Sequence, residues 1–318
     1  MKKPALADIR AAAERIRPFA HRTPVLTSKT LDDLTGASLY FKCENFQKVG
    51  AFKFRGAINA VYSLEEDEAK KGVATHSSGN HAQALALAAR MRGIPAHIVM
   101  PENAPTVKVD AVRGYGARVI FCAPTLQARE DTLGAVVAET GAVFIHPYND
   151  LRIITGQATC ALELLEEVNG LDIVMAPVGG GGLLSGTALS VHYLSPRAKV
   201  IAGEPAGADD ARRSFISGAI VPSVAPKTIA DGLLTSLGEL TFPIIKEHVA
   251  DILTAREETI VAAMKLVWER MKLVVEPSGV VPLAALMENK TLFTGKRVGI
   301  IFSGGNVDLT KLPWVKPG

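Results

Sequence analysis

The chain has 318 residues, of which 48% are hydrophobic and 21% charged, and its formal net charge is +3. This length suits two domains with a large core, and the small net charge without basic clusters among aromatic residues argues against nucleic acid as a partner. No apolar run is long enough to span a membrane, and the N-terminus lacks the apolar core of a signal peptide.

The three cysteines stand far apart in apolar segments, at positions 43, 122 and 160. Their odd number and their spacing predict neither a disulfide framework nor a zinc site. We therefore expect reduced thiols in the core of a cytoplasmic protein.

Taken in order, the chain alternates short strands rich in β-branched residues with helices. This alternation predicts an α/β fold in which parallel sheets carry helices on both faces, with ligands at the carboxyl ends of the strands. The predicted strands cover residues 39–43, 73–75, 96–100, 118–122, 142–145, 172–176, 199–203 and 297–302. The predicted helices cover residues 5–17, 79–92, 106–114, 126–140, 154–168, 183–193, 257–271 and 280–287, with one more that begins near residue 54, and residues 27–30 could cap a further helix.

Lys53 lies between Phe52 and Phe54, at the turn from the strand over residues 39–43 to the following helix. An ammonium group that loses its water has a lowered pKa, and the neutral amine is the nucleophile of Schiff-base chemistry. The simpler interpretation is a lysine whose stem covers apolar surface while its amine stays in water. On this stretch alone, the simpler interpretation is the stronger one.

A run of small and polar residues from His76 to His81 follows the strand over residues 73–75 and opens the next helix. The free N–H groups at a helix start favour anions. One Ser or Asn is enough to cap a helix, so six such residues in succession favour a ligand site.

Four successive glycines, Gly179 to Gly182, separate another predicted strand from its helix. Unobstructed backbone N–H groups at a helix start suit a phosphate. The run is not a P-loop, since no Gly-Lys-Ser/Thr follows. With Ser185 and Glu204 it imperfectly resembles a dinucleotide fingerprint. An NAD-dependent dehydrogenase is therefore an alternative, although it leaves Lys53 without a role.

Two further motifs follow predicted strands. Ser303 places a hydroxyl at the tip of the strand over residues 297–302. Glu204 and Asp210 enclose a loop whose oxygens could bind Mg²⁺ or Ca²⁺. On these residues alone, an ordinary acidic turn is the better interpretation of that loop.

An amine, a phosphate cradle, a hydroxyl at a strand end and a polar helix start together match the needs of pyridoxal phosphate. The sequence resembles the fold-type-II pyridoxal-phosphate enzymes, in particular the group of serine/threonine dehydratases, serine racemases and threo-3-hydroxyaspartate dehydratases. The resemblance covers nearly the whole chain and rests on residues 51–57, 77–81, 179–182 and 303–308, in that order. It implies the fold of the tryptophan synthase β subunit, with two open parallel-sheet domains.

The strand and helix rhythm, taken with this resemblance, predicts where the two domains divide. A large cofactor-binding domain is expected over residues 1–70 and 149–318, and a small domain over residues 71–148. The segment 146–149 then marks the return of the chain from the small domain.

The resemblance also implies a role for each matching residue. Lys53 would bind the cofactor aldehyde and act as a base on one face of the substrate Cα, with Ser78 on the opposite face. The cofactor would be held by the Phe52 ring, by Asn80 at the 3′-oxygen, by Ser303 at the ring nitrogen, and by the N–H groups of Gly179, Gly180, Gly181, Gly182 and Leu183. The substrate carboxylate would meet Ser77, Asn80, His81 and Gln157.

Two departures from the group's pattern concern this assignment. Ala51 stands where many members have Ser, and Ala158 replaces a glycine common next to Gln157. The first is shared by some racemases and hydroxyaspartate dehydratases, so it does not exclude the function. The second affects the expected carboxylate loop.

The same resemblance implies further ligands. Glu204, the carbonyl of Ala208 and Asp210 match the group's site for Mg²⁺, Mn²⁺ or Ca²⁺. Four positions match the surroundings of a nucleotide effector site in some relatives, namely Ser28, Lys48, Tyr115 and Asn306. The group also suggests a homodimer.

The expected activity is conversion of L-threonine, L-serine or 3-hydroxyaspartate to a 2-keto acid and ammonia by α,β-elimination, together with serine racemisation if Ser78 returns the proton. Arg129 could pair with the β-carboxylate of hydroxyaspartate or be a solvated helix charge. Three alternatives stay open: racemisation as the principal activity, a β-replacing synthase, and an amino-acid-binding protein without catalysis.

Overall fold

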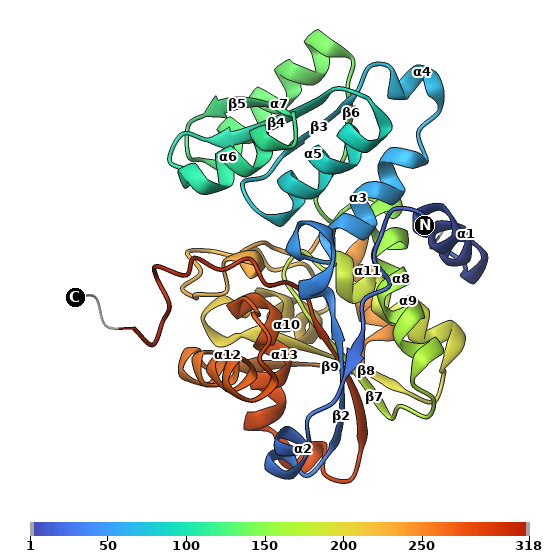
Figure 1. Ribbon diagram of the computed structural model, residues 1–318, viewed down its shortest axis with the longest axis vertical. Coiled ribbons are helices and arrows are strands. Elements are labelled where there is room, and N and C mark those ends of the chain that lie inside the picture. The colour runs from blue at the N-terminus through green and yellow to red at the C-terminus, as the bar shows by residue number, and fades with distance from the viewer. Residues whose placement is uncertain (1–2, 316–318) are drawn as a thin grey trace.

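The structure, a computed structural model, describes residues 3–315, and its larger sheet forms the lower body in Figure 1. Six strands lie in the order β1-β2-β10-β7-β8-β9, and all neighbours are parallel except β1 and β2. Their bounds are β1 Val25–Leu26, β2 Ser38–Cys43, β7 Ile173–Pro177, β8 Lys199–Pro205, β9 Asp251–Ala255 and β10 Arg297–Phe302.

The smaller sheet forms the upper body and is parallel throughout, in the order β5-β4-β3-β6. Its strands are β3 Val73–His76, β4 Ala96–Pro101, β5 Arg118–Cys122 and β6 Val143–Phe144. All four fall within residues 71–148, the segment assigned to the small domain, and the division into domains itself stays a prediction.

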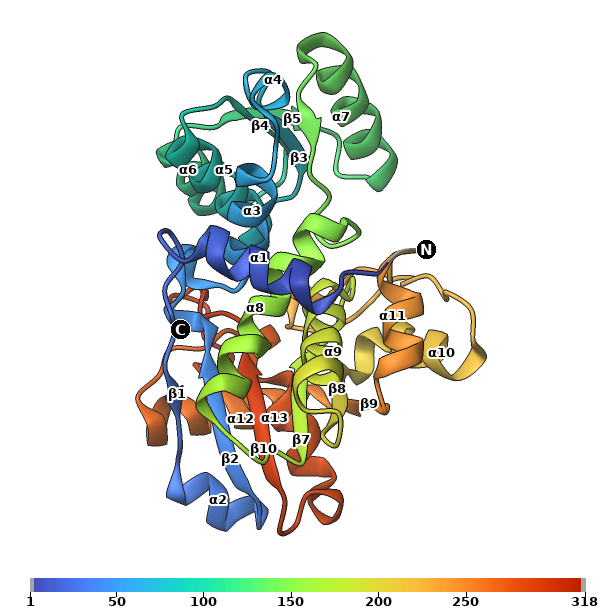
Figure 2. The same ribbon diagram turned by 90° about the vertical axis from the view of Figure 1, so that its right-hand side faces the viewer.

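Helices cover both faces of the larger sheet, as Figures 1 and 2 show. Alternate residues of β7 point to opposite faces, as the two-residue period of a strand requires. Met175 packs in the core with helices α12 and α13, whereas Val174 packs with α8 and α9. This pattern explains why the strand is apolar along its length. The bounds are α8 Leu151–Glu167, α9 Gly182–Leu194, α12 Glu257–Met271 and α13 Pro277–Glu288.

Helix α3 (Lys53–Tyr62) lies between the two sheets (Figures 1 and 2). It packs against α8 on one side and against α5 (Asn80–Arg92) on the other. The remaining helices are α1 Leu6–Ile16, α2 Lys29–Thr35, α4 Glu66–Ala69, α6 Thr106–Gly114, α7 Leu126–Thr140, α10 Asp210–Ser217 and α11 Thr241–His248. The carboxyl ends of both sheets therefore meet near α3.

The predicted α/β architecture is confirmed, and the helices over residues 106–114, 126–140 and 257–271 have the predicted bounds. The prediction missed α4, α10, α11 and β9. Ser28 precedes α2 as expected of a cap, but its side chain makes no capping hydrogen bond. All three cysteines are buried and free. Among residues 3–315, no helix has the length and apolar character needed to cross a membrane.

Candidate active site

Lys53 is the first residue of α3, directly after the turns that follow β2. Its Nζ donates to the carbonyl of Pro147 at 2.8 Å and lies 5.2 Å from the centre of the Phe52 ring. Burial lowers the pKa of this amine to about 8. The amine is thus available in its neutral, nucleophilic form at a much lower pH than an ordinary lysine.

Arg55 lies two residues further along α3 and is fully buried. Its Nε donates to Glu44 at 2.7 Å, and its Nη1 donates to Glu163 at 2.8 Å. Lys42 donates to the same Glu163 at 2.6 Å. This cluster of two cations and two carboxylates, which we call the ion cluster, ties the first turn of α3 to β2, to the turn after it and to α8.

The polar run 76–81 lies at the carboxyl end of β3, where the sequence places it. Ser77 donates its backbone N–H to Val99 at 3.1 Å, and its hydroxyl accepts the N–H of Gly79 at 3.3 Å. Ser78 is partly exposed beside it. Asn80 begins α5, so both serines sit at the start of this helix.

Two imidazoles near Lys53 are held in the neutral form. Burial, and next the charge of Lys53, keep the pKa of His81 well below its ordinary value. His81 Nε2 lies 3.2 Å from the carbonyl of Ile145, and Nδ1 is buried without a partner. Burial likewise lowers the pKa of His146 to about 4, and its Nδ1 accepts the backbone N–H of Asn149 at 2.9 Å. Both rings can offer hydrogen bonds to a ligand without carrying charge.

Asn80 reaches across to the larger sheet. Its Nδ2 donates to Glu276 at 3.0 Å, and its Oδ1 accepts from Asn306 Nδ2 at 2.9 Å. Glu276 is 4% exposed, and burial raises the pKa of its carboxyl to about 7. Residues of both sheets thus share one hydrogen-bond network.

The glycine run lies at the start of α9, with Gly181 as the residue before the helix at φ +89°. This left-handed conformation favours glycine. A side chain at Gly180 would overlap the Tyr148 ring. Since no side chain caps α9, its first N–H groups remain available to an anion.

Ser303 and Gln157 approach the Lys53 turn from two other elements. The carbonyl of Ser303, at the end of β10, accepts the N–H of Phe52 at 3.0 Å. Gln157 is buried on α8, and its Oε1 accepts the N–H of Gly56 at 3.2 Å. Its Nε2 is buried without a partner, which leaves a donor for a ligand.

The acidic loop after β8 brings two buried carboxylates together. Glu204 accepts the N–H groups of Ala211 at 2.8 Å and Arg212 at 2.9 Å, and Asp210 keeps one buried oxygen without a partner. Burial raises the pKa of Glu204 to about 8 and that of Asp210 to about 6. Within residues 3–315 no group of three or more His, Cys, Asp or Glu side chains is arranged for a metal. A cation here would need backbone carbonyls or water as further ligands.

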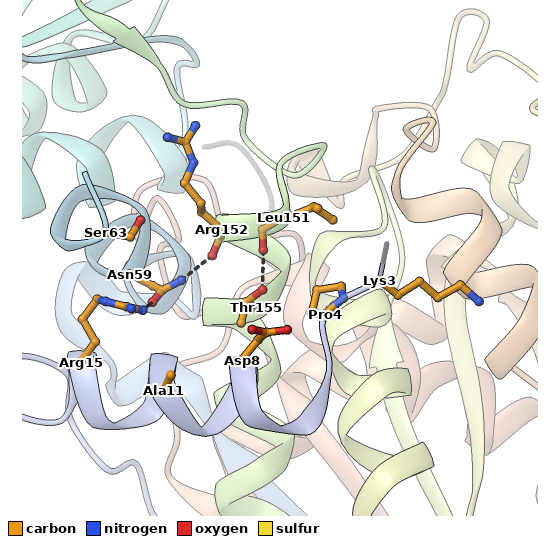
Figure 3. Close-up of a pocket in the computed structure, with 10 residues that line it drawn as sticks. All are labelled: Lys3, Pro4, Asp8, Ala11, Arg15, Asn59, Ser63, Leu151, Arg152 and Thr155. Carbon is orange, nitrogen blue, oxygen red and sulfur yellow. Dashed lines mark hydrogen bonds between the residues drawn. The ribbon is translucent and has the colours of Figure 1, made fainter. Parts of the chain in front are cut away.

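A cavity of about 330 Å³ lies elsewhere, between α1, α3 and α8 (Figure 3). Its polar groups bond to one another: Arg15 donates to Asn59 at 2.6 Å, and Asn59 donates to the carbonyl of Arg152 at 2.7 Å. Figure 3 shows the charged ends of Lys3 and Arg152 pointing away from the other lining residues. With its polar groups satisfied, this cavity offers little to a ligand.

The structure brings Lys53, Asn80, His81, Gln157 and Ser303 to the junction of the two sheets, where each forms a hydrogen bond with another element of that junction. The glycine run joins the junction through Tyr148. Glu204 lies near the end of β8, Ala208 in the turn after it and Asp210 at the start of α10. Sequence reasoning missed Glu276, His146 and the ion cluster. The one signal in the sequence that could have pointed to Glu276 is its position directly before Pro277, because proline is common at the first position of a helix.

These features suit one kind of ligand. The glycine run offers N–H groups to a phosphate, and Lys53 offers an amine to an aldehyde. One side-chain nitrogen each of His81 and Gln157 is buried without a hydrogen-bond partner and could bond polar groups of a ligand. Pyridoxal phosphate carries both the phosphate and the aldehyde.

Comparison with known proteins agrees with this geometry. Residues 16–304 match the family described as "Pyridoxal-phosphate dependent enzyme". A β-hydroxyaspartate dehydratase of Paracoccus denitrificans is 57% identical, over 98% of this chain and 99% of its own. An L-threo-3-hydroxyaspartate ammonia-lyase of Saccharomyces cerevisiae is 50% identical, over 97% and 95%. A crystal structure of serine racemase from Dictyostelium discoideum superposes with a TM-score of 0.93 at 52% identity, covering 96% of this chain and 99% of that one.

Proposed function

This chain belongs to the pyridoxal-phosphate dependent enzymes, and on that premise we propose that it is a dehydratase converting a β-hydroxy amino acid to a 2-keto acid and ammonia. The observation that carries the proposal is the buried amine of Lys53, which has a lowered pKa and no carboxylate partner in the described part of the chain. Among the substrates we place 3-hydroxyaspartate first, because relatives at 57% and 50% identity are named for it.

The cofactor and Lys53 have different roles in the reaction. When bound, pyridoxal phosphate supplies a conjugated ring that withdraws electrons from the substrate Cα. Lys53 accepts the Cα proton, and the β-hydroxyl leaves as water once it has taken up a proton. The released enamine becomes an imine, and one water molecule converts this imine to the 2-keto acid and ammonia. Overall, the water lost in the first stage equals the water consumed in the last.

The cofactor and the substrate would be held by the residues that the resemblance assigned. Phe52, Asn80, the N–H groups of residues 179–183 and Ser303 would hold the cofactor. Ser77, Asn80, His81 and Gln157 would bind the substrate carboxylate. Supporting this, the ring of Phe52 lies beside the Lys53 amine, and Gln157 has a buried N–H donor without a partner.

A β-carboxylate of the substrate would pair with Arg129 on α7. The Nε of Arg129 is buried without a partner. Burial lowers the pKa of His76, at the end of β3, and raises that of Cys122, at the end of β5, and the charge of Arg129 acts on both groups. This supports a position of Arg129 near the carboxyl edge of the smaller sheet. A fork of guanidinium donors at this edge suits a second carboxylate.

Serine racemisation is the second candidate activity. It is favoured by the 52% identical serine racemase structure and by Ser78, which is partly exposed at the start of α5. Ser78 would return a proton to the face of Cα opposite Lys53. Changing Ser78 to Ala should then reduce racemisation more than elimination from the L-isomer. Equal loss of both activities would count against two bases.

A divalent cation, Mg²⁺, Mn²⁺ or Ca²⁺, would bind at Glu204, the Ala208 carbonyl and Asp210. The unpaired buried oxygen of Asp210 supports this, because such an oxygen is costly without a partner. Thermal unfolding with EDTA and with added Mg²⁺ tests it. A rise in Tm with Mg²⁺ that disappears in the Asp210→Asn variant is expected, and equal Tm values would contradict the site.

Three family expectations remain proposals: the division into domains at residues 71 and 148, a cytoplasmic homodimer, and a nucleotide effector near Ser28, Lys48, Tyr115 and Asn306. Sedimentation tests the dimer, and calorimetry with Mg·ATP tests the effector.

The proposed activity is tested by proton NMR in D₂O, with L-serine, L-threonine and the threo-3-hydroxyaspartate isomers in separate tubes. A growing keto-acid signal from hydroxyaspartate is expected. Loss of the serine Cα proton without keto acid would make racemisation the principal activity. A protein inactive on every hydroxy acid, yet active once a thiol is added, would be a β-replacing synthase.

A further inference from the structure

Glu276 is a buried acid that none of the motifs explains. It directly precedes Pro277, the first residue of α13, in the position where an acidic side chain usually caps a helix. Here the side chain makes no capping hydrogen bond to its own helix. The carboxylate must therefore be held by partners outside α13, because a buried charge without partners is costly.

Those partners are the Asn80 amide and Asn306. Asn80 Nδ2 lies 3.0 Å from Glu276 Oε1 and 3.3 Å from Oε2, and the backbone N–H of Asn306 donates to Oε2 at 3.1 Å. The side chain of Asn306 closes the network by donating to Asn80 Oδ1 at 2.9 Å. Both ends of the Asn80 amide are thus specified, and a flipped amide would place two donors or two acceptors against each other.

Glu276 also lies against the loop that carries Ser303. Its N–H donates to the carbonyl of Gly304 at 3.0 Å, and a side chain at Gly304 would come within 2.6 Å of Glu276 Oε1. Gly304 in turn pairs with Ala51, two residues before Lys53. The carboxylate is therefore packed where α5, the Ser303 loop and the Lys53 turn meet.

We propose that Glu276 is a positioning residue, which fixes the Asn80 amide so that one Nδ2 hydrogen is left for the cofactor. This inference rests on the proposed function, in which Asn80 contacts the 3′-oxygen. An amide nitrogen has two hydrogens, and the two distances to Glu276 correspond to one shared hydrogen. The second hydrogen remains, and its direction is fixed by the first.

Other charges face Glu276 from both bodies. Asp231 lies close enough to raise its pKa further, and Lys108 of α6 lies close enough to lower it. Asp231 and Lys108 form a salt bridge of 2.8 Å with each other. Their charges have opposite effects on the pKa of Glu276, so the buried partners Asn80 and Asn306 determine how the Glu276 carboxylate is oriented.

The test is Glu276→Gln in the full chain. Glutamine replaces one carboxylate oxygen by an NH₂ group, so one of the two donors, Asn80 Nδ2 or the Asn306 N–H, then faces another donor at its shorter contact. We expect the apoprotein to bind pyridoxal phosphate about tenfold more weakly, as for one lost hydrogen bond. We also expect the visible absorbance maximum of the bound cofactor to shift, because its 3′-oxygen loses a fixed partner. A merely structural role would lower stability without moving that maximum.

Two further variants keep the result interpretable. Glu288→Gln changes the other end of α13, where the acid bonds Arg256, and should leave binding and spectrum unchanged. In Asn80→Ala, adding Glu276→Gln should weaken cofactor binding no further, because Glu276 acts through Asn80.

The outcomes separate the two proposals. A folded Glu276→Gln protein with wild-type affinity and spectrum would overturn the role of Glu276 alone, and so would additive losses in the double variant. A wild-type protein that retains no absorbance from pyridoxal phosphate after the unbound cofactor is removed would overturn the proposed function itself, and the role of Glu276 with it.

Discussion

Lys53 and Arg55 stand two residues apart in the first turn of α3, and their surroundings are opposite. Arg55 is fully buried and bonds two carboxylates, which Lys42 helps to balance. Lys53 bonds only the Pro147 carbonyl, and burial lowers its pKa to about 8. A paired cation keeps its charge and fixes structure, whereas an unpaired one gives up its proton and becomes reactive.

The difference also shows how the site is built. Each side-chain nitrogen of Arg55 and Lys42 in the ion cluster has hydrogen-bond partners within the protein, so the cluster holds α3 in place. The side of α3 that bears Lys53 adjoins the buried free nitrogens of His81 and Gln157. Rigidity and reactivity are thus supplied by different residues of one helical turn.

The largest effect is expected when the reactive amine of Lys53 is removed. Lys53→Ala should reduce keto-acid formation by more than about 10³-fold, because both the amine that binds the cofactor and the base are lost. The free energy of unfolding of the apoprotein should not fall. Burial lowers the folded-state pKa of Lys53, so below pH about 8 its charge destabilises the fold, and the variant lacks that charge. Urea denaturation and the NMR assay check both results, with Lys70→Ala, on an exposed salt bridge, as the control.

The next largest effect is expected when Arg55 is removed from the ion cluster. Arg55→Met should lower the free energy of unfolding by about 3–5 kcal/mol, since Glu44 and Glu163 are left buried without their partner. The control Arg213→Met removes an exposed pair with Asp209 and should cost less than about 1 kcal/mol. Equal losses in the two variants would show that the ion cluster contributes no more than a surface pair.

A third cation, Arg129, sharpens the comparison, because its Nε is buried without a partner, and Lys53 likewise has no carboxylate partner. Arg129→Gln should lower kcat/KM on 3-hydroxyaspartate about 10–100-fold, as for a lost charge-assisted hydrogen bond, and leave L-serine unaffected. Arg118→Gln, at the opposite end of the smaller sheet, is the control. Parallel loss on both substrates would contradict a β-carboxylate site.

The smallest effect concerns pH. Only the neutral amine of Lys53 reacts with an aldehyde, so the rate at which the apoprotein takes up pyridoxal phosphate should rise about tenfold per pH unit below pH about 8 and then level off. Stopped-flow absorbance measures it. A rate that keeps rising toward pH about 10 would mean that Lys53 is an ordinary, solvated lysine.

The sequence predicted those parts of the fold that depend on local pattern. Strands rich in β-branched residues and helices of regular period were placed within a few residues, as for β10, α7 and α12. The segment between β8 and α12 was missed because its helices are short and its loops long, which leaves no sustained period. The antiparallel pairing of β1 was missed because two residues carry no orientation signal.

The residues of the site also fall into those that the sequence predicted and those that it did not. Lys53, residues 76–81 and the glycine run could be found because each follows a strand in an unusual local pattern. Glu276 could not, since its partners Asn80 and Asn306 lie far away in the sequence. The ion cluster likewise joins charges from β2, α3 and α8, and isolated charges in a sequence look like surface residues.

The measurement that tests this account most directly is borohydride reduction of the protein loaded with pyridoxal phosphate, followed by peptide mass spectrometry. Reduction makes the bond between the cofactor and its lysine permanent. We expect the cofactor mass on the peptide that contains Lys53 and on no other lysine. A label on a different lysine, or an active protein without any label, would contradict the distinction drawn between Lys53 and the paired cations around it.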